Sequence, residues 1–193
     1  MSVRKIITKG DPVLGKKAHP VTQFDEKLHG LLDDMRDTLA QASGAGLAAP
    51  QVGILRRVVV IDVGDGIIEL VNPEIIAAEG EQTGLEGCLS VPGKYGVVTR
   101  PNVVRVRAQD RDGIFFDDED EGLTARCFCH EIEHLDGHLY TEHIDRFLTE
   151  EELFLKEGQN EENKVVEKDS WMATCFSSCI TAPCKCLCGR MGR

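Results

Sequence analysis

No stretch of this sequence approaches the run of about 18 apolar residues that a membrane-spanning helix needs. The segment Met1–Lys17 mixes charges with short apolar pairs and so lacks the apolar core of a signal peptide. Positive charge is also scarce, because 22 Lys and Arg residues stand against 33 Asp and Glu residues and leave a net charge of -11. Such a surface repels phosphate backbones. We therefore expect a cytoplasmic protein that binds neither membranes nor nucleic acid directly.

Cysteine is sparse in most of the chain and crowded at its end. Cys88, Cys127 and Cys129 lie in the body, and the other five of the eight cysteines lie between Cys175 and Cys188. Sparse cysteines in a cytosolic protein are more often metal ligands, nucleophiles or buried thiols than disulfides. The spacing at the end does not follow the paired pattern of a zinc ribbon. A disordered or artefactual tail is favoured there, and a metal-binding tail is the alternative.

Composition divides the chain of 193 residues into three parts. This length and a hydrophobic content of 41% suit one domain with a sizeable core, which we place at residues 1–148. Residues 149–170 are acidic and begin with a capping-box-like sequence, which predicts a short helix and a linker. Residues 171–193 form the cysteine-rich tail.

Periodicity predicts two helices separated by strands. Between Phe24 and Ala42, apolar side chains recur at spacings of three and four, which is typical of an amphipathic helix: Leu28, Leu31, Leu32, Met35 and Leu39. We expect the glycines of Ser43–Gly46 to end this helix through a positive φ. Short β-branched runs from residue 57 to 107 predict mostly antiparallel strands. A hairpin turning at Asp112-Gly113 and a second helix over 123–139 complete the prediction.

The second predicted helix carries the sequence His130-Glu131-Ile132-Glu133-His134. Two histidines four residues apart project from one face of a helix and can hold one divalent ion. Glu131 can then take a proton from an attacking water and deliver a proton to the leaving amine. The alternative is a helix whose histidines and glutamates are simply solvated.

A hydrolytic metal site needs a third protein ligand from elsewhere in the chain. His138 continues the four-residue spacing, but three such histidines spread over roughly 12 Å of helix axis and cannot meet one ion. We expect His138 at the surface or behind the ligands, and neither Cys127 nor Cys129 as a ligand. Cys88 is the better candidate, because the adjacent Gly87 allows close approach and a cation keeps a thiolate deprotonated. An inert buried thiol is the alternative.

Three ordered motifs together resemble those of the peptide deformylases: Gly44–Gln51, Glu86–Ser90 and His130–Gly137. The resemblance extends from near Met1 to about Phe147. It implies an α+β fold in which antiparallel strands surround a central helix that carries the HExxH metal motif. It also implies a metal-dependent hydrolase that removes the N-formyl group from the formyl-methionine of newly synthesised polypeptides and releases formate.

The resemblance further implies a role for each matching residue. The metal ligands would be Cys88, His130 and His134, and the catalytic carboxylate would be Glu131. The side chain of Gln51 and the backbone N–H of Leu89 would donate to the formyl oxygen. Gly46 would keep the site narrow, and Leu123 and Cys127 would line an apolar pocket for the methionine side chain.

The family's metal is Fe(II), and the resemblance implies the same ion for this chain, while a Cys/His/His site also suits zinc, nickel or cobalt. Glu133 stands where the family usually has Asp. The charge is retained, so contacts that support the helix or its histidines are expected to be tuned and not lost. The acidic segment argues against ribosome docking through a basic C-terminal helix, although transient proximity to the ribosome stays open. Two other interpretations are a zincin-type protease and a non-enzymatic module that binds peptides or buffers metal.

Overall fold

The computed structural model describes residues 2–149 and 152, and its helices and strands form the first of two units, Met1–Leu148. The predicted cysteine-rich tail and most of the predicted acidic segment lie outside the described residues. The elements follow in the order α1 (Glu26–Ala42), β1 (Gly46–Ala48), η1 (Ala49–Val52), β2 (Val58–Asp62), β3 (Ile67–Glu79), β4 (Gln82–Cys88), β5 (Val91–Arg100), β6 (Val103–Gln109), β7 (Phe115–Glu121), α2 (Gly122–Asp136), η2 (Tyr140–Glu142) and β8 (Arg146–Phe147).

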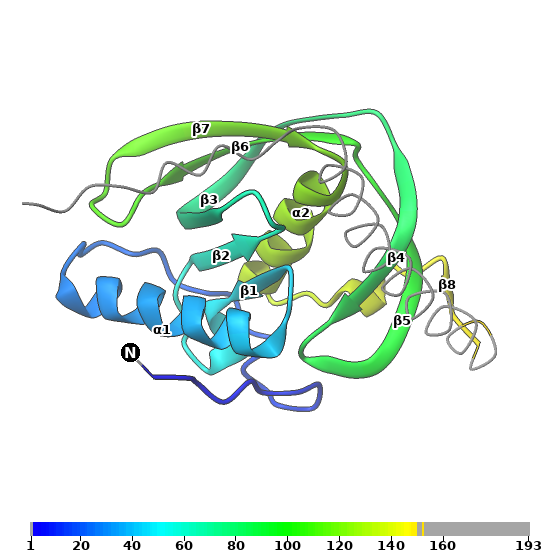
Figure 1. Cartoon of the computed structure of the whole chain (residues 1–193), viewed down its shortest axis with the longest axis horizontal. Coiled ribbons are helices and arrows are strands. Elements are labelled where there is room, and N and C mark those ends of the chain that lie inside the picture. The colour runs from blue at the N-terminus through cyan, green and yellow to red at the C-terminus, as the bar shows by residue number, and fades with distance from the viewer. Residues whose placement is uncertain (1, 150–151, 153–193) are drawn as a thin grey trace, which may run out of the picture. The chain divides into compact units, whose positions relative to one another are not determined.

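These elements form two antiparallel sheets with a helix between them. One sheet has the strand order β1-β2-β3-β6-β7 and the other the order β4-β5-β8. Helix α2 lies between the two sheets (Figure 1). The predicted α+β architecture, with strands around a central helix, is confirmed.

Strand β2 shows how the sequence divides the core. Its side chains alternate between the two faces of the larger sheet, as the period of two in a strand requires. Val58 and Val60 pack with the apolar stripe of α1, whereas Val59 and Ile61 pack with α2. The sheet is therefore covered by a helix on each face at this point, and α2 is buried along most of its length.

Helix α1 follows its prediction except at its end. Its N-cap is Asp25, whose carboxylate accepts from the backbone N–H groups of Lys27 and Leu28, both at 3.1 Å. The residue with positive φ at its C-terminus is Ser43, at 52°, rather than Gly44 or Gly46 as predicted. The glycines serve close packing instead, because a Cβ on Gly44 would lie 2.8 Å from a methyl group of Leu89.

Strand β4 was not predicted, because its glycines give it low intrinsic β propensity. Pairing and packing form it: a Cβ on Gly84 would lie 3.1 Å from the guanidinium of Arg126, and one on Gly87 would lie 2.7 Å from the ring of Tyr95. The predicted hairpin turn at Asp112-Gly113 lies between the paired strands β6 and β7.

Helix α2 ends at Asp136, three residues before the predicted end. Gly137 adopts a φ of 85° and caps the helix, and a Cβ there would lie 2.9 Å from the backbone of Gly15. Within the described part of the chain, no helix combines the length and the apolar character needed to cross a membrane.

Candidate metal centre and active site

Two elements bring the three predicted metal ligands together. Helix α2 presents His130 and His134 from the core, and the end of β4 presents Cys88. One ligand atom from each residue lies within 4.8 Å of the others, and Cys88 Sγ is 3.2 Å from His134 Nε2. Donors that bind one tetrahedral ion at ordinary bond lengths lie roughly 3.3–3.8 Å apart. The donor set therefore fits a single metal ion.

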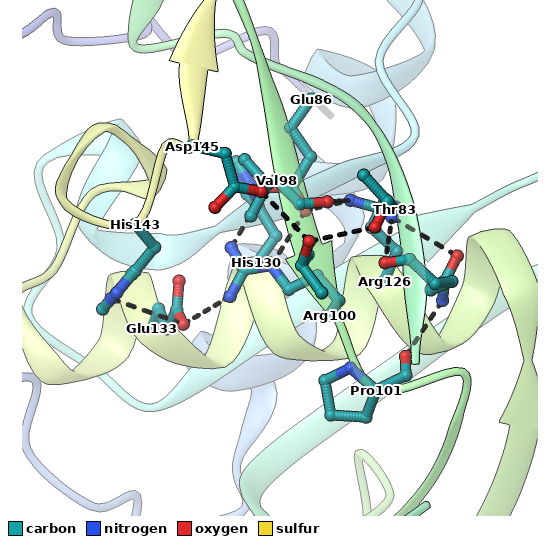
Figure 2. Close-up of polar contacts among 12 residues, drawn as sticks. Thr83, Glu86, Val98, Arg100, Pro101, Arg126, His130, Glu133, His143 and Asp145 are labelled. Carbon is teal, nitrogen blue, oxygen red and sulfur yellow. Dashed lines mark hydrogen bonds and ion pairs between the residues drawn. The ribbon is translucent and has the colours of Figure 1, made fainter. Parts of the chain in front are cut away.

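A buried carboxylate that the sequence analysis did not single out holds His130 from behind. Glu86 accepts a hydrogen bond from His130 Nδ1 at 3.0 Å, which leaves Nε2 directed to the ligand group. Arg100 donates to both Glu86 oxygens, at 2.9 and 3.0 Å, and Arg126 donates to one at 2.8 Å (Figure 2). Arg100 also donates to Glu133. Glu133 is thus connected to His130 through Arg100 and Glu86.

Glu86 and the two histidines of the ligand group have strongly shifted pKa values. Burial would raise the pKa of Glu86, but hydrogen bonds from His130 and Arg100 outweigh it and lower the pKa to about 2. Burial would lower the pKa of His130, but hydrogen bonds to Cys88 and Glu86 outweigh it and raise the pKa to about 10. Burial and the charges of His130 and Arg100 lower the pKa of His134 well below its usual value. Protons and a metal ion would therefore compete for His130, whereas His134 is held neutral and ready to bind.

Glu131 lies beside the ligands in a different environment. It is only 4% exposed, it lines the cavity, and its Oε2 atom has no hydrogen-bond partner within the described residues. Burial raises the pKa of this carboxyl to about 7. A buried carboxylate with a free oxygen is suited to accept a proton from a substrate or water in the cavity.

Gly46 leaves the space that the Glu131 side chain occupies. A Cβ on Gly46 would lie 2.5 Å from Glu131 Oε1 and 2.8 Å from its Cγ. We expect Gly46→Ala to displace this carboxylate and to lower kcat about tenfold while metal content is retained, since small misplacements of reacting groups slow reactions strongly. Steady-state kinetics on metal-loaded protein measures this.

Gly30→Ala on α1 is the matched control, because a Cβ there meets no atom within 4 Å. An equal loss of kcat in both variants, or no loss in Gly46→Ala, would show that the contact with Glu131 does not matter.

Gln51 is oriented as a donor to the site. Its Oε1 accepts from the backbone N–H of Ala48 at 2.7 Å, so its Nε2 faces Cys88 Sγ at 3.5 Å and Ser90 Oγ at 3.3 Å. Gln51 is 1% exposed and lines the same cavity as Leu89. Both predicted donor residues therefore adjoin the ligand group.

These residues line a cavity of about 460 Å³. Leu123 and Cys127 form part of its wall, the first 57% exposed and the second buried. Burial raises the pKa of the Cys127 thiol to about 12, so it stays neutral. Cys129 packs in the core cluster of α2, and His138 is exposed and pairs with Glu142 at 2.8 Å. Cys127, Cys129 and His138 are therefore absent from the ligand group found among the described residues, as predicted.

The chain is similar in sequence and in structure to known proteins. Residues 3–150 match the family described as polypeptide deformylase. The peptide deformylase of Agathobacter rectalis is 58% identical over 145 residues, which cover 75% of this chain and 92% of the relative. Peptide deformylase 1 of Bacillus subtilis is 52% identical over 160 residues, which cover 82% of this chain and 100% of the relative. The crystal structure of the Thermotoga maritima enzyme superposes with a TM-score of 0.74 at 41% identity, covering 75% of this chain and 99% of that one. The chain belongs to the polypeptide deformylase family.

Proposed function

We propose that the cavity beside Cys88, His130 and His134 is where this peptide deformylase works. The enzyme removes the N-formyl group from new polypeptides, in a family whose members depend on a metal. One observation carries the assignment of the site. The three ligand atoms converge within 4.8 Å, next to the buried carboxylate of Glu131, whose Oε2 finds no partner in the described part of the chain.

Fe(II) is the metal that we propose for this site, and zinc, nickel or cobalt also suit its ligands. When bound, the ion would polarise the formyl carbonyl and make water more acidic. Glu86 would hold His130 in the tautomer that can bind it.

The remaining roles fall to groups that line the cavity. Glu131 would accept the proton of the attacking water and pass a proton to the amine that leaves. Gln51 Nε2 and the Leu89 N–H would donate to the formyl oxygen as negative charge grows on it. Gly46 would keep the site narrow enough for a formyl carbon, and Leu123 and Cys127 would contact the methionine side chain.

The setting that we propose is the cytoplasm, in transient proximity to the ribosome and by a route other than a basic C-terminal helix. Residues 1–148 would form the catalytic domain, 149–170 an acidic helix and linker, and 171–193 a cysteine-rich tail without a catalytic role. In support, the three ligands, Glu131 and the residues that line the cavity in the described part of the chain all belong to 1–148.

Formate release from formyl-Met-Ala-Ser tests this proposal. The protein is purified without oxygen and loaded with Fe(II), because iron beside a thiolate is readily lost on oxidation. It should turn the peptide over, and a chelator should stop turnover by removing the metal. Reloading with zinc, nickel or cobalt ranks the metals. A chain that ends at Ser170 should turn over equally. Cleavage of internal bonds in unformylated peptides, with formyl groups untouched, would contradict the proposed function.

A further inference from the structure

The segment that follows α2, residues 139–148, lies along the outer edge of β5; we call it the post-helix segment. Asp145 N donates to Val97 O at 2.9 Å, and Leu148 N donates to Tyr95 O at 3.0 Å. Its strand β8 pairs with β5 at Gly96 and Val97. Two side-chain contacts add to these (Figure 2). His143 Nε2 lies 3.7 Å from Glu133 Oε1 on α2, and Asp145 accepts a hydrogen bond from Thr99 of β5 at 3.0 Å. The post-helix segment therefore determines where this part of β5 lies.

The same part of β5 forms a wall of the active-site cavity. The register with β4 pairs Gly87 with Tyr95 and then Cys88 with Val91, so the stretch from Pro92 to Lys94 is left out of the ladder. These three residues and Tyr95 all line the cavity. A stretch without ladder partners depends on other contacts to hold its position.

Tyr140 of the post-helix segment supplies such a contact and touches the metal ligands as well. Its hydroxyl donates to the carbonyl oxygen of Lys94 at 2.9 Å. Its ring centroid lies 5.6 Å from that of His130, with 31° between the planes. The side chain is 1% exposed and belongs to the cluster that includes Val98 and Cys88. One rigid, buried ring thus spans from the cavity wall to a candidate metal ligand.

We infer that Tyr140 is a positioning residue that ties the cavity wall at Lys94 to His130. The inference rests on the proposed function of the cavity. The hydroxyl preorganises the wall against which the peptide binds, and the ring supports the orientation of the imidazole. The two parts of the side chain therefore affect different steps, and they can be removed separately.

Tyr140→Phe removes the hydroxyl and keeps the ring. Without its partner at Lys94 the wall must be ordered by the substrate, so we expect KM for formyl-Met-Ala-Ser to rise about three- to tenfold. kcat should change less than about twofold, because such a loss affects ground state and transition state alike. Cobalt affinity, measured by competition with a chelator, should not change. Backbone amides of residues 93–95 should exchange hydrogen faster than in the wild type.

Tyr140→Leu removes the ring as well, and we expect cobalt affinity to fall about tenfold in addition to the effect on KM. Thr38→Val is the matched control, since it removes another buried hydroxyl, one that donates to Asp34 O at 2.6 Å within α1. It should lower thermal stability and leave KM unchanged.

An unchanged KM in Tyr140→Phe would overturn the inference, as would an equal rise of KM in Thr38→Val. A fall of cobalt affinity in Tyr140→Phe as large as that in Tyr140→Leu would also overturn it, because the hydroxyl and the ring would then not act separately. Failure of the wild-type protein to release formate would instead remove the proposed function on which the inference rests.

Discussion

Glu131→Gln should lower kcat by roughly 100- to 10,000-fold, the range by which a positioned acid or base accelerates a reaction. The amide keeps the shape of the side chain that packs against Gly46 but cannot accept a proton. Metal content should remain at the wild-type level, because Glu131 is not among the three ligand residues. Stability should not fall either, since the change removes a buried carboxylate whose Oε2 has no partner among the described residues.

Formate release by metal-loaded protein, together with metal analysis and thermal unfolding, measures all three effects. Glu133→Gln is the matched control, an identical chemical change two residues along the same helix. Glu133 does not line the cavity and accepts from Arg100, so its replacement should reduce kcat by less than about tenfold. Full activity of Glu131→Gln would exclude Glu131 from the mechanism. A loss of metal together with the loss of activity would make it a ligand rather than a base.

The second large effect is expected for Glu86→Gln, which should lower both the affinity for the metal ion and the free energy of unfolding. His130 would lose its anionic partner, and the loss of such a partner typically weakens metal binding about 10- to 100-fold. Arg100 and Arg126, which are 5% and 7% exposed, would keep their charges without this counterion. Breaking a buried ion pair costs about 3–5 kcal/mol. Competition with a chelator for zinc or cobalt and urea unfolding of the metal-free protein separate the two effects.

Glu119→Gln provides the control for Glu86→Gln. Glu119 pairs with Arg105 at 2.7 Å, but both side chains are nearly half exposed. Surface pairs contribute at most about 1 kcal/mol, so stability should hardly change and metal affinity not at all. If Glu86→Gln bound metal and unfolded like this control, the Glu86 network would have no role in holding His130.

The two effects have a common cause in the burial of the site. Glu86 accepts hydrogen bonds from three residues, and those from His130 and Arg100 lower its pKa to about 2. Glu131 Oε2 has no partner among the described residues, and burial raises the pKa of Glu131 to about 7. Carboxylates with such different surroundings serve different purposes. Glu86 fixes a histidine, and Glu131 is left free to exchange a proton.

Local sequence alone predicted the features of this protein that depend on the spacing of residues near one another in the chain. The spacing of Leu28 to Leu39 predicted α1, because side chains three and four residues apart share a helix face. The same rule placed His130 and His134 on one face of α2. The three ordered motifs indicated the family, and through it the α+β fold that the structure confirms.

Only the tertiary structure decided which charged residues are buried together. Glu86, Arg100 and Arg126 look like ordinary solvated charges in the sequence, and their partners lie 14 to 44 residues away. Their pairing exists because β4, β5 and α2 meet in space. Likewise, strand β4 and the contact of Tyr140 with Lys94 depend on packing partners distant in the chain. Local propensity carries no information about such partners, since a buried ion network or a glycine-rich strand is stabilised only by the neighbours that the fold supplies.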